Sequence, residues 1–123
     1  MKLKNGLIMG IYAALIAVTD DKHKFKAKVA LDLSRNLKNF REVATDIEQV
    51  RLKTFAKYRQ DNEETLTGDA AMAFHKEFSE VLNAETDVAL IPVKGEDLDL
   101  ETNSISIQTV ISVLLDNVIV ASA

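Results

Sequence analysis

The chain has 123 residues with a formal net charge of −4, and 47% of its residues are hydrophobic. This length supports one domain with a hydrophobic core, and the negative net charge gives no overall attraction to nucleic acid. The absence of cysteine excludes disulfides and thiolate chemistry. We therefore expect a single domain over residues 1–123, in which residues 1–85 form a helical hairpin core and residues 86–123 form an arm.

An uncharged apolar segment, Leu7–Val18, comes first along the chain. It is too short to cross a membrane as a helix, so we expect a buried core helix with Asn5 as its N-cap and no membrane insertion. A secretory signal peptide is the alternative, because lysines precede the segment. The cleavage context is poor, since the large residue Leu15 would stand where a small one is needed for cutting after Ala17.

A short basic segment follows and is the best candidate for binding a polyanion through contacts to phosphate. Its period-two alternation around Phe25 predicts extended backbone, and positive charge is unfavourable at a helix N-terminus, so the next helix is expected to begin near Val29 or later. The candidate is weak, because the net charge is negative and only one aromatic residue is interleaved. A solvated basic segment or a contact to an acidic partner is the alternative. The lysines concerned are Lys22, Lys24, Lys26 and Lys28.

The longest regular pattern in the sequence runs from about Lys28 to Arg59. Apolar residues recur there at steps of three and four, which predicts one stripe along a helix of about 30 residues, roughly 45 Å long. The opposite face mixes charges of both signs and is expected to be solvated. The stripe contains Val29, Leu33, Leu37, Phe40, Ala44, Ile47, Val50, Phe55 and Tyr58, and the polar face includes Lys28, Asp32, Arg35, Asn36, Asn39, Glu42 and Asp46.

A helix of this length needs a partner for its apolar stripe. One alternative is a later helix of the same chain, and the other is a second copy in a self-association seam; both can hold. The stripe residues that we select as interface candidates are Leu33, Leu37, Phe40 and Ile47.

A second helix is predicted over Ala70–Asn83, with Asp69 as its N-cap. The short polar connection before it allows it to fold back antiparallel on the long helix. Phe74 and Phe78 lie on its apolar stripe and would pack against apolar residues of the long helix. The partners expected on that helix are Phe40, Ile47 and Phe55.

The remainder of the sequence predicts extended structure and one more helix. Asp87–Val93 is rich in β-forming residues and contains a proline that suits an edge strand, for which Met1–Leu3 is a candidate partner. After a turn over residues 94–96, the alternating segment around Leu98 either returns as a hairpin or lies over the core. A final helix is expected over Ile107–Val118, followed by an apolar tail that would dock against another chain. Its interface candidates are Val118, Ile119 and Val120.

No group of residues carries the signature of a catalytic, cofactor or metal site. Asp97, Asp99 and Glu101 have the spacing that begins a calcium loop, but Thr102 and Gln108 stand where that loop needs glycine and glutamate. The two histidines lack the spacing of zinc ligands, and no phosphate loop or nucleophile motif is present. We therefore expect no enzyme, no cofactor and no bound metal.

Several short motifs, taken in order, resemble a group of small uncharacterised proteins encoded by tailed bacteriophages among their structural and assembly genes. These are Met1-Lys-Leu-x-Asn, Lys26-x-Lys-Val, Asn36-Leu-Lys, Ile47-Glu-Gln-Val-Arg, Lys57-Tyr, the pair Phe74 and Phe78, Val88-Ala-Leu-Ile-Pro and Leu98-Asp-Leu. The resemblance covers most of the chain, although the motifs are generic helix sequence, and it brings no catalytic residues.

The sequence thus predicts a mainly α fold (α+β), in which a long antiparallel helical hairpin carries a packed N-terminal helix and a small β element. The resemblance implies a non-enzymatic phage structural or assembly protein in the virion or the host cytoplasm. Such a protein would act by oligomerising or by binding other virion proteins. The alternative function is a soluble accessory binder, either an assembly chaperone or an inhibitor of a host protein.

Overall fold

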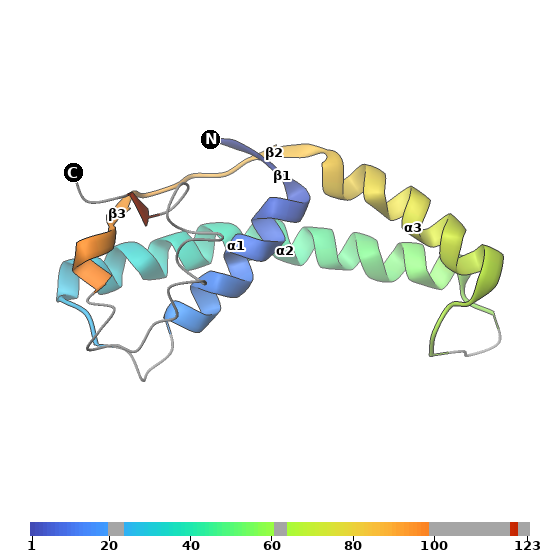
Figure 1. Ribbon diagram of the computed structural model, residues 1–123, viewed down its shortest axis with the longest axis horizontal. Coiled ribbons are helices and arrows are strands. Elements are labelled where there is room, and N and C mark those ends of the chain that lie inside the picture. Colours follow the sequence, from blue (N-terminus) through green and yellow to red (C-terminus); the bar gives the residue numbers. More distant parts are fainter. Residues whose placement is uncertain (20–23, 61–63, 99–118, 121–123) are drawn as a thin grey trace.

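The computed structural model describes residues 1–19, 24–60, 64–98 and 119–120, and it confirms the mainly helical fold with a small antiparallel sheet (Figure 1). The elements are, in order, β1 Lys2–Lys4, α1 Asn5–Val18, α2 Ala27–Tyr58, α3 Gly68–Asn83, β2 Glu85–Asp87, β3 Val93–Lys94, the 3-10 helix η1 Gly95–Leu98 and β4 Ile119–Val120.

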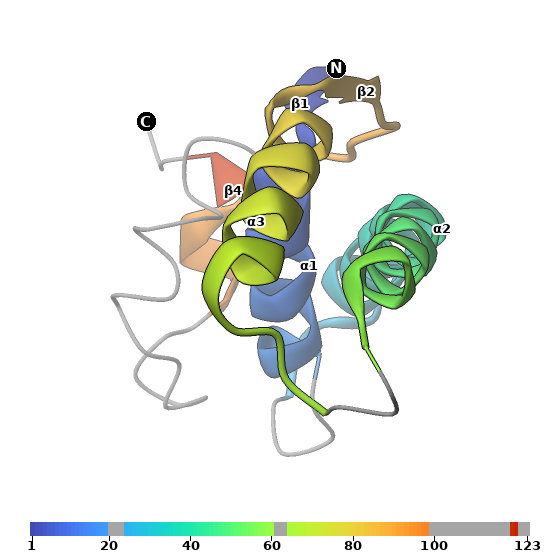
Figure 2. The same cartoon turned by 90° about the vertical axis from the view of Figure 1, so that its right-hand side faces the viewer.

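The long helix α2 runs the length of the molecule, and the other two helices divide its apolar stripe between them. Figure 1 shows α1 crossing the first part of α2, while α3 folds back along the second part, and Figure 2 shows both on the same side of α2. The predicted helical hairpin and the packed N-terminal helix are therefore confirmed. The core is largest where α1 meets α2: Ile8, Ile11, Leu15, Leu33 and Phe40 are all fully buried there.

The second half of α2 packs on α3 through aromatic side chains. The rings of Phe55 and Phe74 meet edge to face with centroids 6.1 Å apart, and Phe74 stacks on Phe78 at 5.7 Å. Phe55 is thus a partner of Phe74, as the sequence predicted. Phe40 and Ile47, the other two expected partners, belong to the main core cluster, against which Phe78 also packs.

The helix starts differ from those predicted. α2 begins at Ala27 although Lys28 then lies in its first turn, and the reason is an ion pair: both carboxylate oxygens of Asp32 accept from the Lys28 ammonium, at 2.7 and 2.9 Å. Asp69 is not the N-cap of α3, which begins one residue earlier at Gly68. Asp69 instead lies in the first turn, where its negative charge interacts favourably with the positive end of the helix dipole.

Asn5 does not cap α1 either, because its side chain is used for a contact between distant elements. Lys4 occupies the N-cap position without a side-chain hydrogen bond, and Asn5 is the first helical residue. Its amide donates to the Val81 carbonyl at 2.8 Å, and its side-chain oxygen accepts from the Thr86 hydroxyl at 2.6 Å. Asn5 therefore ties the start of α1 to the junction between α3 and β2.

The β structure is smaller than predicted. β1 pairs antiparallel with β2 in the register Leu3 to Thr86, which confirms that the first residues supply a strand. The single strand expected over Asp87–Val93 is wrong, because only its two ends pair: β2 with β1, and β3 with β4 in parallel. Of the expected turn over residues 94–96, Lys94 ends β3 and the next two residues begin η1, in which Leu98 is fully buried. The predicted helix over residues 107–118 lies outside the described residues.

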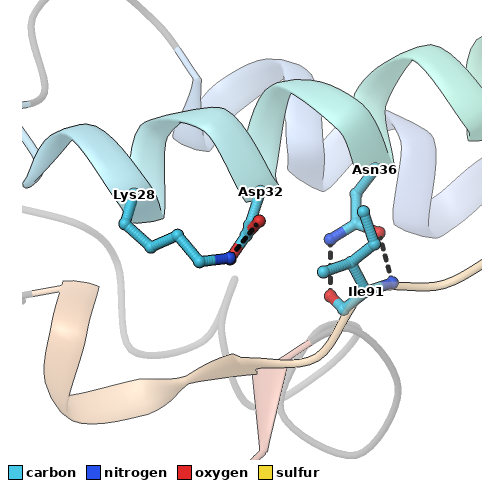
Figure 3. Close-up of polar contacts among 4 residues, drawn as sticks. All are labelled: Lys28, Asp32, Asn36 and Ile91. Atoms are coloured by element: carbon cyan, nitrogen blue, oxygen red, sulfur yellow. Dashed lines mark hydrogen bonds and ion pairs between the residues drawn. The ribbon is translucent and has the colours of Figure 1, made fainter.

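Segment 88–92 lies along α2, and this contact corrects the prediction that the polar face of α2 is wholly solvated. Asn36 is fully buried: its amide nitrogen donates to the Ile91 carbonyl at 2.7 Å, and its oxygen accepts from the Ile91 N–H at 2.8 Å (Figure 3). Asp32 is also buried, one turn earlier. A partly buried extended segment without a strand partner must satisfy its backbone polar groups in another way, and Asn36 does so for Ile91.

Candidate protein-interaction site

The interface candidates on the α2 stripe are covered by the chain itself. Leu33, Phe40 and Ile47 are buried in the core, and Leu37 is partly buried against it. α1 packs on the first half of the stripe, so α3 is not the only helix that covers it. Of the tail candidates, Ile119 and Val120 form β4, whose backbone pairs with Val93 and Lys94, and Val118 lies outside the described residues. An intermolecular role for these seven residues remains a prediction.

Other large apolar side chains are exposed. The most exposed among the helical residues that the structure describes are Met72, Leu52, Ile16, Leu31, Val50 and Leu7, and the first three are about half exposed or more, at 72%, 51% and 49%. Leu31 lies among the charged residues of α2, whereas Ile16 and Leu52 each follow, by four positions, a residue that lines a pocket. The apolar surface that is available to a partner is therefore found beside the core stripe and not on it.

That pocket, which we call the proximal pocket, lies where α1 diverges from α2. It has a volume of about 390 Å³. Met9, Tyr12 and Ala44 give it apolar walls, and all its lining residues are Met9, Tyr12, Ala44, Thr45, Glu48 and Gln49. Ile16 follows Tyr12 by four residues on α1, and Leu52 follows Glu48 by four on α2, so both lie one turn further along the same helix faces.

A second pocket, the distal pocket, lies between α2 and α3 near the connection that joins them. Its volume is about 230 Å³. Phe55, Leu66 and Phe74 provide apolar surface, and the full lining is Arg51, Phe55, Glu64, Thr65, Leu66, Ala71, Phe74 and His75. His75 therefore lines this pocket. Its ring centroid lies 5.5 Å from that of Phe74, which lines the same pocket.

The two pockets are joined by an ion pair. Glu48 lines the proximal pocket and Arg51 the distal one, and three hydrogen bonds of 2.6 to 3.1 Å connect their side chains. The hydrogen bonds from Arg51 lower the pKa of Glu48, and the same bonds raise the pKa of Arg51. The two side chains therefore carry opposite charges that compensate each other. We call the two pockets together the three-helix cleft.

A second polar cluster connects α2 and α3 beside the distal pocket. The Lys57 ammonium lies 3.0 Å from a Glu77 carboxylate oxygen, across from α2 to α3. A hydrogen bond with Tyr58, and then one with Lys57, lower the pKa of Glu77, while Glu77 raises the pKa of both partners. These side chains are exposed, so the cluster orients the two helices and adds little to the free energy of unfolding.

The weak polyanion candidate is not assembled into a compact site by the described residues. Lys24, Lys26 and Lys28 are exposed around the start of α2, and Lys28 is paired with Asp32. Lys22 lies outside the described residues. Polyanion binding by this segment remains a prediction.

Within residues 1–19, 24–60, 64–98 and 119–120, no three histidine or acidic side chains come together in a way that could hold a metal ion. Of the calcium-like triplet, Asp97 is in η1, and Asp99 and Glu101 lie outside these ranges. No helix in the same part of the chain is both long enough and apolar enough to span a bilayer.

Comparison with family models, curated proteins and solved structures finds no match for this chain. The candidate site therefore rests on the geometry described above.

Sequence reasoning did not find the three-helix cleft. Its lining residues come from the edges of three helical stripes, and an amphipathic pattern assigns such edge positions to neither face. The exposure of Ile16 and Leu52 depends on the angle at which α1 crosses α2, which no local pattern encodes. The one sequence signal available was the apolar residue Leu52 beside a charged face.

Proposed function

We propose that this protein is a non-enzymatic structural or assembly component of a tailed bacteriophage, and that it acts by binding other proteins. The observation that supports this most is the three-helix cleft, with the exposed apolar side chains Ile16 and Leu52 beside it. Exposed apolar surface of this kind is typical of protein-binding sites. The resemblance of the ordered sequence motifs to small phage proteins supplies the biological setting.

The partners proposed are other virion proteins or further copies of this chain, in the particle or in the host cytoplasm during assembly. The test is quantitative mass spectrometry of particles purified from cells that produce the phage. We expect a fixed number of copies per particle, or of copies per assembly intermediate. Repeated absence from both fractions would refute the proposal.

The homo-oligomer part of the proposal has a separate test. Light scattering after gel filtration gives the mass of the purified protein, whose single chain weighs 13.6 kDa. A fixed multimer would assign the apolar tail to contacts between copies. A monomer would refute self-association of the free protein and would leave assembly on a partner.

One feature favours the alternative function of an accessory binder, such as an assembly chaperone or an inhibitor of a host protein. The two pockets, of about 390 and 230 Å³, have room for a few side chains, so they suit a single segment of one partner better than a broad lattice contact. A stable one-to-one complex in infected cells, with no copies in the particle, would favour this alternative.

A further inference from the structure

The first helix begins with an asparagine that is followed by glycine. We propose that Asn5-Gly6 is a site of spontaneous deamidation, that the contacts around Asn5 control the rate of this reaction, and that the product keeps those contacts open. They lie where the start of α1 meets the end of α3 and β2, and we call them the α1–α3 junction. Its residues are Asn5, Val81, Ala84 and Thr86. The inference goes beyond the proposed function and does not depend on it.

The sequence supplies the reacting groups. The backbone nitrogen that follows an asparagine can attack the side-chain carbon Cγ, so that a C–N bond closes a succinimide ring. The bond from Cγ to the amide nitrogen breaks, and this nitrogen leaves as ammonia with the proton of the attacking nitrogen. Water then opens the ring at either carbonyl and gives aspartate or isoaspartate, without an oxidant or a reductant.

Glycine is the neighbour that permits this attack best, because it has no Cβ to hinder the nitrogen and its backbone is flexible. Asn5 is the only asparagine of the chain that is followed by glycine. Gly6 is the second residue of α1, and the first four N–H groups of a helix have no acceptor within the helix. The attacking nitrogen therefore has no helical hydrogen bond to break.

In the folded protein, Asn5 makes contacts that the reaction must break. The residue is buried, with 7% of its surface exposed. Its amide nitrogen donates to the Val81 carbonyl at 2.8 Å, and its side-chain oxygen accepts from the Thr86 hydroxyl at 2.6 Å. Its backbone N–H donates to the Ala84 carbonyl at 2.9 Å. Ring closure turns the side chain towards the Gly6 nitrogen, so the junction must open first.

The junction can open without unfolding the rest of the molecule. The strands beside it, β1 and β2, have three residues each and form a two-stranded sheet in the described part of the chain. The largest part of the core lies further along α1, where that helix crosses α2 (Figure 1). Short elements at an edge open locally at a lower free-energy cost than global unfolding. Deamidation in the native protein therefore proceeds at the rate of the open form multiplied by its population.

The product does not fit the closed junction. A carboxylate has no hydrogen to donate at neutral pH, so an aspartate at position 5 would place its charge against the Val81 carbonyl and would leave that carbonyl without its donor. The Thr86 hydroxyl could still donate, but a buried charge with one donor is costly. Isoaspartate also inserts a methylene group into the backbone of the first turn of α1. The open form is therefore favoured after the reaction, which water does not reverse.

The first experiment incubates the full-length protein at neutral to slightly alkaline pH, in buffer and in concentrated urea. Peptide mapping by mass spectrometry quantifies the replacement of NH₂ by OH at each asparagine. We expect Asn5 to convert before any other asparagine in urea. In buffer its conversion should be at least about tenfold slower, because only the open fraction reacts.

Gly6→Ala tests the chemistry of the site. A Cβ at this position would lie 3.5 Å from the Leu82 carbonyl oxygen and 3.7 Å from the Leu82 Cβ, which are ordinary contact distances, so the fold accommodates it. The added methyl group hinders the attacking nitrogen. Conversion at position 5 in urea should therefore be largely lost within the same incubation.

Thr86→Val tests the control by the junction, because it removes the hydroxyl that donates to Asn5 and keeps a side chain of similar shape. We expect conversion in buffer to rise about fivefold or more, with no change in urea, where the junction is absent. The matched control is Thr54→Val, which removes a hydroxyl that donates to the Val50 carbonyl at an exposed site of α2. It should change the rate in buffer less than about twofold.

Asn5→Asp tests the consequence of the reaction. In hydrogen exchange, the amide at position 5 should lose its protection, whereas the Ile91 amide, which Asn36 holds, should keep it and serves as the internal reference.

Each of five results would overturn the inference. They are equal conversion at Asn5 in buffer and in urea, no conversion in urea, unaltered conversion in Gly6→Ala, equal rates for the two threonine variants in buffer, and retained protection at position 5 in Asn5→Asp.

Discussion

The buried amide of Asn36 gives the sharpest prediction about what holds the arm to the helical core. Asn36→Leu keeps a side chain of similar size on α2 but removes both hydrogen bonds to Ile91 (Figure 3). Its matched control is Asn39→Leu, the same change one turn later, which removes one longer hydrogen bond of 3.2 Å from an exposed site.

The magnitude follows from what the substitution leaves behind. A polar group that loses its partner costs about 1 to 3 kcal/mol when buried, and Asn36→Leu strips the partner from the N–H and the carbonyl of Ile91, which are partly buried, so the lower value applies to each. The expected loss in the free energy of unfolding is therefore about 2 kcal/mol, and that of the control is below about 1 kcal/mol.

The assay is urea unfolding followed by circular dichroism. With a slope of about 2 kcal/mol per molar, a loss of about 2 kcal/mol lowers the urea midpoint by roughly 1 M. Hydrogen exchange supplies a local readout: the Ile91 amide should be protected in the wild type and should lose protection in Asn36→Leu, but not in Asn39→Leu. Equal midpoints for the two variants would refute the assignment of the arm contact to Asn36.

Three further changes test the packing of the hairpin. Phe74→Ala removes the ring that contacts both Phe55 and Phe78, and should lower the free energy of unfolding by about 3 to 4 kcal/mol in the same urea assay; a loss below about 1 kcal/mol would contradict this packing. Gly68→Ala should cost about 1 kcal/mol, because φ at Gly68 is 60°, where a Cβ is strained although nothing lies near it; no change in midpoint would mean that this turn adopts another conformation. The pKa of Glu77 is lowered, so its contribution to stability is present above the ordinary value of 4.5 and is lost as the pH falls through the lower folded value. Glu77→Gln should therefore reduce the change in the urea midpoint between about pH 5 and pH 3. An unaltered pH profile would refute a role for this carboxylate.

The sequence predicted α2 and α3 well because each carries a periodic apolar stripe, and it predicted α1 because that segment is a continuous uncharged apolar run. The predicted bounds of the long helix, Lys28 to Arg59, are each within one residue of α2. The expected start near Val29 or later is wrong, because the carboxylate of Asp32 compensates the positive charge that Lys28 places at the N-terminus of α2. Local charge rules fail where a neighbour one turn away supplies the counter-charge.

The contacts between distant segments were not predictable from the same patterns. Asn36 falls on the polar face by its spacing, and only the path of segment 88–92 explains its burial. Asn5 is a good N-cap by type, but its partners Val81 and Thr86 lie far along the chain. Polar residues with short side chains are suited both to caps and to tertiary hydrogen bonds, and a single sequence does not distinguish these uses.

The most direct test of the central claim, that the protein enters phage assembly by binding another protein at the three-helix cleft, measures incorporation of variants into particles. Cells producing the phage are supplied with the wild type, Leu52→Glu or Leu31→Glu, and the copies per purified particle and per assembly intermediate are counted by mass spectrometry. We predict that the wild type and Leu31→Glu are incorporated equally, and that Leu52→Glu is incorporated at least about tenfold less at equal cellular concentration. Equal incorporation of all three proteins would contradict the claim.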